Sequence, residues 1–156
     1  MTFVKSAKFL ACSVMLGLTF VGSAHCAELG TGPEAEALVK KAVALVKSAG
    51  PDKAYDEVTN GKSLKDRDLY VAINDLSGKC LAHGANPKMI GKDMTELKDA
   101  EGRYPTKMML EVAKGPGKGW TGDYKFMNPA TQKVQVKVAY VERVGDLMVI
   151  SGIYKP

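Results

Sequence analysis

The stretch Leu69-Tyr-Val-Ala-Ile-Asn-Asp75, continued by Leu-Ser-Gly78 and Lys79-Cys-Leu-Ala-His83, decides the fold of this chain. Its first run is rich in β-branched and aromatic residues, which favour strands. Asp75 and Gly78 supply the side-chain hydrogen bonding and the backbone freedom that a tight reversal needs. The stretch therefore predicts a β-hairpin with strands over Leu69–Asn74 and Lys79–His83.

Three more strands are expected near the C-terminal end, over Trp120–Phe126, Val134–Arg143 and Leu147–Tyr154. Turn-forming residues separate them, at Asn128–Thr131 and at Gly145–Asp146. The middle run alternates between one face with Val134, Val136, Val138 and Tyr140 and another with Gln135 and Lys137. Alternation with a period of two is typical of a strand with one buried face.

Helices are expected before and between these strands. Glu34–Ala49 repeats apolar residues with a helical period, and Thr31 and Glu34 have the spacing of a capping box. Shorter helices are predicted over Pro51–Val58 and Pro105–Lys114, each opened by proline. The chain is therefore expected to be an α+β domain, with a long N-terminal helix packed on a five-stranded antiparallel sheet.

The first 27 residues have the pattern of a secretory signal peptide. Lys5 and Lys8 form a basic start, Phe9–Ala24 is uncharged and largely apolar, and small residues follow. We expect cleavage after Ala27, with cleavage after Ala24, lipid modification of Cys26 or an uncleaved anchor as alternatives. Residues 28–33 are then a linker and residues 34–156 a single domain, located in the periplasm or secreted.

Composition excludes several classes of protein. The formal net charge is +5, but lysines are spread along the chain and aromatic residues are few, so no nucleic-acid partner is expected. Beyond the leader only Cys80 and His83 remain of the cysteines and histidines, too few for a disulfide, a zinc site or haem attachment. The serines lack a nucleophile elbow. We expect no cofactor, no metal and no catalytic residue, hence not an enzyme.

Short motifs along the chain, in a fixed order, carry a resemblance to a known family. They are Leu69–Asp75 with Gly78 and Leu81-Ala-His83, Asn86-Pro-Lys-Met-Ile-Gly91, Leu97-Lys-Asp-Ala-Glu-Gly102, Gly117-Lys-Gly-Trp120, Tyr124, Asn128-Pro129, Lys137-x-x-Tyr140-Val and Ser151-Gly-Ile-Tyr154. Together they cover about residues 34–155 and resemble single Cache domains, which have a PAS-like fold.

The resemblance implies a function in sensing. Domains of this family face the periplasm or the cell exterior, usually as the sensing part of a chemoreceptor or histidine kinase. They bind small molecules, often short carboxylates, between the sheet and the connecting loop and helix. Because the sequence stops at Pro156 with no transmembrane helix after Tyr154, we expect a free-standing form. It would signal to a membrane-bound receptor or kinase, or only capture a solute.

Six residues are candidates for the ligand pocket: Tyr70, His83, Trp120, Tyr124, Lys137 and Tyr140. Lys137 would supply the positive charge for a carboxylate, and a solvent-facing lysine between Val136 and Val138 is the alternative. The aromatic residues would supply walls and hydroxyl donors, or else ordinary core packing. His83 would donate to the anion or titrate near neutral pH, or else bond the loop that follows it.

A few other residues allow two interpretations. Asp99 would bind an amine or cap a turn, Arg103 would clamp an anion, and Asn128 is expected to shape a turn. Cys80 is expected to be a small apolar residue in a strand. A ligand-free interaction module, or a homodimer formed through the first helix, is the alternative to a sensor.

Overall fold

The computed structural model of this chain describes residues 29–155. The predicted signal peptide and its cleavage site lie outside the described residues. Within residues 29–155, no helix is both long and apolar enough to cross a membrane.

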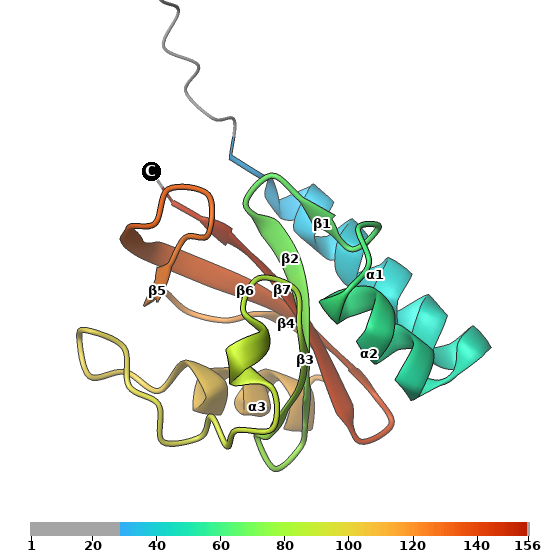
Figure 1. Cartoon of the computed structure of the whole chain (residues 1–156). Helices are drawn as coiled ribbons and strands as arrows, with labels where there is room; N and C mark the ends of the chain where they lie inside the picture. Colours follow the sequence, from blue (N-terminus) through green and yellow to red (C-terminus); the bar gives the residue numbers. More distant parts are fainter. Residues whose placement is uncertain (1–28, 156) are drawn as a thin grey trace, which may run out of the picture.

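Helices and strands alternate along the chain in much the predicted order (Figure 1). The helices are α1 (Gly32–Ala49), α2 (Pro51–Thr59), the short 3₁₀ helix η1 (Pro87–Met89) and α3 (Pro105–Lys114). The strands are β1 (Lys65–Asp66), β2 (Leu69–Asp75), β3 (Cys80–His83), β4 (Lys118–Trp120), β5 (Tyr124–Met127), β6 (Val134–Val144) and β7 (Leu147–Tyr154).

All strand pairs are antiparallel, and the sheet runs β1-β2-β7-β6-β4, with β3 on β2 and β5 on β6. The predicted hairpin is confirmed as β2 and β3. The structure has seven strands where five were expected, partly because Trp120–Phe126 is divided into β4 and β5. At the break, the Thr121 hydroxyl accepts a hydrogen bond from the Ala139 N–H at 3.0 Å, replacing a backbone partner.

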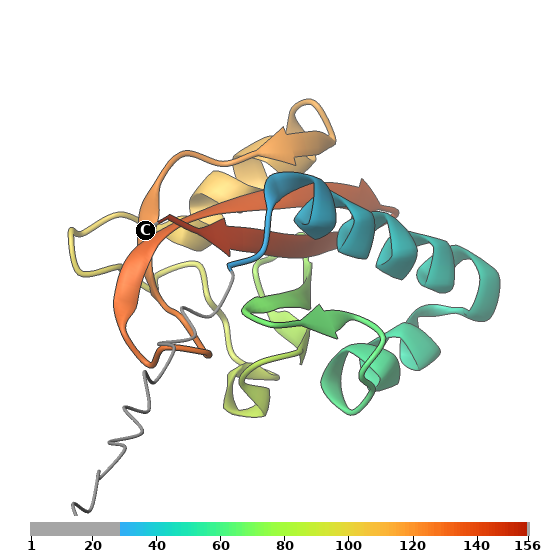
Figure 2. The ribbon, with the colours of Figure 1, turned by 90° about the horizontal axis from the view of Figure 1, so that it is seen from above.

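The sheet separates two cores (Figures 1 and 2). On one face α1 and α2 pack over a core that contains Val39, Val43, Val58, Leu64, Val71, Ile73, Tyr140 and Val149. On the other face α3 packs over a core that contains Met109, Ala113, Tyr124, Ala139, Val141, Met148 and Ile150. The α+β class and the helix-on-sheet packing are confirmed.

The start of α1 is tied to the sheet by charged side chains. Glu34 accepts hydrogen bonds from the Thr31 backbone N–H and hydroxyl, both at 2.8 Å, as the capping-box spacing predicted. Glu34 also pairs with Arg67 at 2.6 Å. The backbone N–H of Gly30 donates to the buried carboxylate of Asp68 at 2.7 Å. The helix consequently begins at Gly32, two residues earlier than expected.

Candidate functional site

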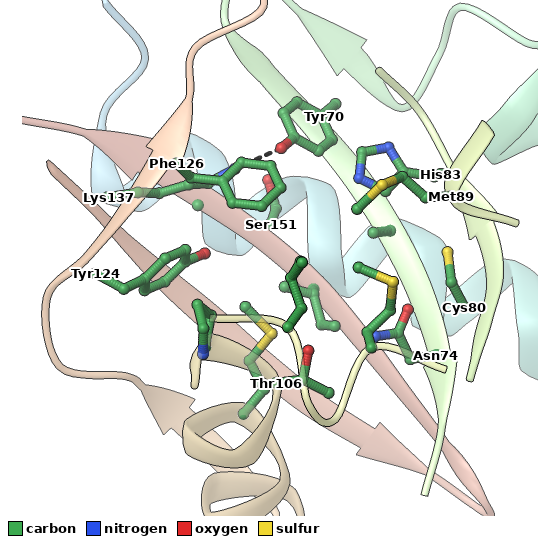
Figure 3. A pocket seen from close by; sticks show the side chains of 17 residues that line it. Tyr70, Asn74, Cys80, His83, Met89, Thr106, Tyr124, Phe126, Lys137 and Ser151 are labelled. Atoms are coloured by element: carbon green, nitrogen blue, oxygen red, sulfur yellow. Dashed lines mark hydrogen bonds between the residues drawn. The ribbon is translucent and has the colours of Figure 1, made fainter. Parts of the chain in front are cut away.

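A small cavity lies on the α3 side of the sheet, under the segment that connects β3 to α3 (Figure 3). Its volume is about 60 Å³, room for about four to six water molecules. Most of the wall is apolar. It is lined from the sheet by Tyr70, Ala72, Asn74, Cys80, His83, Tyr124, Phe126, Lys137, Ile150, Ser151 and Gly152, and from the connection and α3 by Met89, Met94, Leu97, Pro105, Thr106 and Met109.

Lys137 is the cation of this cavity and is 3% exposed. Its ammonium donates hydrogen bonds to the hydroxyl oxygens of Tyr70 at 2.8 Å and Tyr154 at 3.2 Å. The rings of Tyr70, Tyr154 and Phe126 surround it, with centroids at 4.1, 4.5 and 5.4 Å. Among the ion pairs of residues 29–155, none involves Lys137. The ammonium is therefore buried among aromatic rings without a carboxylate partner in the described residues.

The solvent-facing interpretation of Lys137 is wrong. Lys137 shares its face of β6 with Ala139 and Val141, which are fully buried in the α3-side core. Val134 and Val136 are on the opposite face, where they are at least partly exposed. In this half of the strand, the apolar side chains therefore mark the more exposed face, and the charged one points inward.

The two tyrosines beside Lys137 are neutral hydrogen-bonding groups. The Tyr154 hydroxyl donates to the carbonyl oxygen of Met127 at 2.7 Å, which leaves its oxygen free to accept from Lys137. Burial, followed by the proximity of Tyr70, raises the pKa of Tyr154 far above its usual value. The Tyr70 hydroxyl oxygen accepts from Lys137, and its proton remains available to Tyr154, 3.4 Å away, or to a ligand.

His83 is held in one tautomer at the edge of the cavity. Its Nδ1 accepts hydrogen bonds from the backbone N–H groups of Ala85 at 3.2 Å and Asn86 at 2.9 Å, so the remaining proton resides on Nε2. Burial lowers the pKa of His83 to about 4, with smaller contributions from Lys137 and Lys65. His83 is thus both bonded to the following loop and a neutral N–H donor at physiological pH.

Of the six candidate residues, the structure brings four together: Tyr70, His83, Tyr124 and Lys137 line one cavity. Tyr124 is completely enclosed, and burial raises its pKa well above the usual value.

Trp120 and Tyr140 do not line this cavity, and their placement in the pocket is corrected. Tyr140 lies three positions from Lys137 on one strand, and an odd spacing puts side chains on opposite faces. Trp120 is paired directly with Tyr140 across β4 and β6 and shares its face. The two rings meet edge to face at 5.5 Å, and the Trp120 indole N–H donates to Glu36 of α1 at 3.1 Å.

Several residues in and around the cavity were missed by sequence reasoning. Phe126, on the cavity wall, and Tyr154, behind it, complete the aromatic surround of Lys137. Tyr154 ends the Ser151–Tyr154 motif, whereas Phe126 had no signal beyond its place in a predicted strand. Asn74 and Thr106 add two buried polar side chains. No local pattern indicated them, because they meet only when the loop and α3 fold over the sheet.

Asp99 and Arg103 hold the connecting segment and are not part of the cavity wall. Asp99 Oδ1 accepts from the backbone N–H groups of Glu101 and Arg103, and Oδ2 accepts from Arg103 Nε and the Lys125 backbone, all at 2.8–2.9 Å. Burial alone would raise the pKa of Asp99, but these hydrogen bonds lower it far below the usual value. The turn interpretation of Asp99 is confirmed, and the turn is fastened to β5.

No group of three or more His, Cys, Asp or Glu side chains within residues 29–155 is arranged to hold an ion. Cys80 is buried, as expected, and burial raises its thiol pKa to about 11.

An antiparallel sheet with helices on one face and a small cavity beneath a loop and helix on the other defines an α+β sensor fold of the PAS-like class. The comparison with protein families narrows this class. The model of the family "Single Cache domain 2" matches residues 31–155, and the chain belongs to this family of extracytoplasmic sensor domains.

Individual relatives are chemotaxis receptors. The methyl-accepting chemotaxis protein McpP of Pseudomonas putida is 29% identical over 91 residues, which are 57% of this chain and 16% of that receptor. A methyl-accepting chemotaxis protein from Vibrio parahaemolyticus has a TM-score of 0.66 at 21% identity, covering 78% of this chain and 86% of the solved one. A Cache chemosensory domain described for carboxylic acid recognition has a TM-score of 0.64 at 23% identity, covering 80% and 88%. These likenesses establish the fold.

Proposed function

We propose that this protein is an extracytoplasmic sensor or solute-capture module that binds a small organic anion in the cavity around Lys137. The single observation that carries this proposal is a buried ammonium with no carboxylate partner among the described residues. An unpaired buried charge is costly. A ligand carboxylate entering the cavity would remove that cost.

The cavity chemistry favours a short monocarboxylate. Lys137 Nζ, the Tyr70 hydroxyl and His83 Nε2–H are donors that a carboxylate can accept from. No Asp or Glu lines the cavity, so the ammonium of an amino acid would be buried without a partner. A volume of about 60 Å³ fits about four to six non-hydrogen atoms. The carboxylic acid recognised by the similar Cache chemosensory domain agrees with this class.

Signalling would require a second protein. The relatives named above are methyl-accepting receptors, and this chain matches only a small share of one of them. We propose that ligand occupancy is communicated to a membrane-bound receptor or kinase, and that the protein has no enzymatic activity. Export by the N-terminal 27 residues would place the domain in the periplasm or outside the cell.

A thermal-shift screen tests the proposal. The exported protein would be mixed with short monocarboxylates, dicarboxylates, amino acids and amines, because a ligand that binds only the folded state raises the melting temperature. We expect monocarboxylates to give the largest shifts. Titration calorimetry should then show at least a tenfold loss of affinity in Lys137→Ala, with Lys133→Ala, an exposed lysine on the same hairpin, as the matched control.

Two outcomes would contradict the proposal. Unchanged affinity in a folded Lys137→Ala variant would remove Lys137 from the site. No shift with any compound would favour the alternative of a ligand-free interaction or dimerisation module in the periplasm.

A further inference from the structure

One end of the sheet carries an apolar surface that no element in residues 29–155 covers. The cross-strand partners Met127 and Val134 are 48% and 56% exposed. Val136 and Val138 alternate with Val134 on the same face of β6, and Ile153 is paired directly with Val138. These last three are half-buried. We refer to the five residues as the hairpin patch.

The patch is open because α1 begins too late to cover it. A Cβ on Gly32, the first residue of α1, would lie 3.5 Å from the Trp120 ring. Trp120 is paired with Tyr140, so α1 covers β6 from about Tyr140 onward. The β5–β6 hairpin extends past the start of the helix (Figure 2).

The charge around the patch is positive. No acidic residue occurs between Met127 and Val141. Lys133, at the tip of the hairpin, is exposed and takes part in none of the ion pairs of residues 29–155. Lys155 lies next to Val136, whose carbonyl accepts its backbone N–H at 2.8 Å, and its side chain pairs with Asp123. Lys133 is thus the lysine at the apolar tip whose charge no ion pair of residues 29–155 compensates.

The described chain also enters the domain at this end. Gly30 packs so closely against Leu69, at the start of β2, that a Cβ would lie 2.2 Å from its side chain. Both ends of the described chain and the hairpin lie at one end of the domain (Figures 1 and 2). The uncharged run Phe9–Ala24 ends five residues before Leu29, a span of at most about 17 Å. Any form that keeps this run in a bilayer therefore holds the patch near the lipid surface.

We propose that the hairpin patch docks on an anionic phospholipid bilayer, with Met127 and Val134 entering the headgroup region and Lys133 pairing with lipid phosphates. Exposed apolar side chains beside a lysine can bind membrane interfaces by burying apolar area and by attraction of the lysine to anionic lipids. Self-association through the same patch is disfavoured, because it would bring the hairpin lysines of two copies together. This surface is separate from the Lys137 cavity. Membrane docking extends the proposed function and rests on one part of it, the export of the domain.

A fluorescent reporter on the exported protein tests the docking. An environment-sensitive dye on Met127→Cys should shift to the blue with vesicles of phosphatidylethanolamine and phosphatidylglycerol, and less with phosphatidylcholine alone. The matched control is Asp146→Cys, at the opposite end of β6, where the native side chain is 96% exposed. Equal responses at the two positions would overturn the proposal. So would the absence of a response at Met127→Cys.

Vesicle flotation of patch variants gives a second measurement. Met127→Ser with Val134→Ser should lower the fraction bound to anionic vesicles at least fivefold. Ile90→Ser removes an exposed apolar side chain elsewhere and should leave the bound fraction unchanged. A different result would assign the patch to a second copy of the chain: the parent protein sediments as a dimer and does not bind vesicles, and the patch variant sediments as a monomer. Ligand binding is not used in either readout, so failure of the proposed ligand site leaves this test intact.

Discussion

At the scale of single residues, Lys137 combines a cost to folding with a proposed role in binding. Its ammonium is buried, and its hydrogen-bond partners are two neutral tyrosine hydroxyls. Cation–π attraction to three rings offsets part of the desolvation cost. We therefore expect the folded protein with an empty anion site to be less stable than a variant in which an apolar side chain replaces Lys137.

Replacing the ammonium with an apolar group should therefore stabilise the empty protein. We expect Lys137→Met to raise the free energy of unfolding by about 1–2 kcal/mol without ligand, since a methionine of similar length fills the same aromatic surround. Urea denaturation measures this. Lys133→Met, on the exposed tip, should leave stability nearly unchanged. A destabilised Lys137→Met variant would mean that the ammonium contributes more to folding than it costs.

His83 should make stability depend on pH. Its folded pKa of about 4 lies below the ordinary 6.5, because burial disfavours the charged ring. As pH falls, His83 is protonated in the unfolded chain before it is protonated in the folded protein. Its contribution to the free energy of unfolding, up to about 3 kcal/mol, is therefore present above pH 6.5 and is lost as pH falls toward 4. In His83→Asn, whose amide oxygen can replace Nδ1 as acceptor, the slope between pH 4 and 6.5 should flatten. An identical slope in both proteins would contradict the assignment.

At the scale of elements, alternation identified the strands but not always their buried faces. Val134, Val136 and Val138 predicted the strand correctly, but their alternation with Lys137 favoured the solvent-facing alternative for that lysine, which is wrong. The reason is that α1, which packs on that face, begins at about the level of Tyr140 and leaves the three valines uncovered, which only the assembled fold determines. Trp120 and Tyr140 were expected in the pocket because they occur in the family motifs, although alternation puts Tyr140 and Lys137 on opposite faces of β6. Tyr70 and His83 lie on strands that are buried along most of their length, and Tyr124 is the one buried residue of β5, so all three reach the cavity wall.

Close approach of β6 and β7 leaves no room for a side chain at Gly152. A Cβ there would lie 2.4 Å from the carbonyl oxygen of Val138 and 2.8 Å from Lys137 Cε. We expect Gly152→Ala to destabilise the protein by about 1–3 kcal/mol and to weaken ligand binding by displacing Lys137. Gly32→Ala, which meets only the Trp120 ring at 3.5 Å, is the matched control and should be neutral. Calorimetric unfolding of both variants checks this.

The connection between β3 and α3 depends on Asp99. An asparagine at this position presents one oxygen and an N–H₂ group to the four N–H donors that the carboxylate now accepts. We expect Asp99→Asn to lower the melting temperature by about 5–10 °C and to speed amide exchange between Met94 and Tyr104. Unchanged exchange there would show that the segment is held by its apolar contacts alone.

At the scale of the whole molecule, one sheet is shared by two cores with different tasks. The α1 and α2 side is packed with aliphatic side chains, and the α3 side contains the cavity. Ligand binding should therefore slow amide exchange in α3 and in residues 84–104 much more than in α1. Hydrogen-exchange mass spectrometry with and without a bound monocarboxylate measures this difference. Equal protection of both layers would mean that the ligand acts on global stability alone.

The class of the domain, its hairpin and its helix order were predictable because they depend on local periodicity and turn residues. The cavity was predictable only in part. Its cation, Lys137, bonds to Tyr154, which is 17 residues away and meets it through the β6–β7 register. Three methionines contribute to its roof. Met89 lies in one of the family motifs, but no local pattern indicated that Met94 and Met109 face a cavity.

The position of Trp120 determines what optical methods can detect in this protein. It is the only tryptophan in the chain, it is 36% exposed, and its indole bonds to a carboxylate of α1 on the face away from the cavity. Its emission therefore reports on whether the first helix is docked. An anion beside Lys137 would leave that emission almost unchanged, so a silent tryptophan titration would say nothing about occupancy. Absorbance of the tyrosines around the ammonium is the better spectroscopic signal.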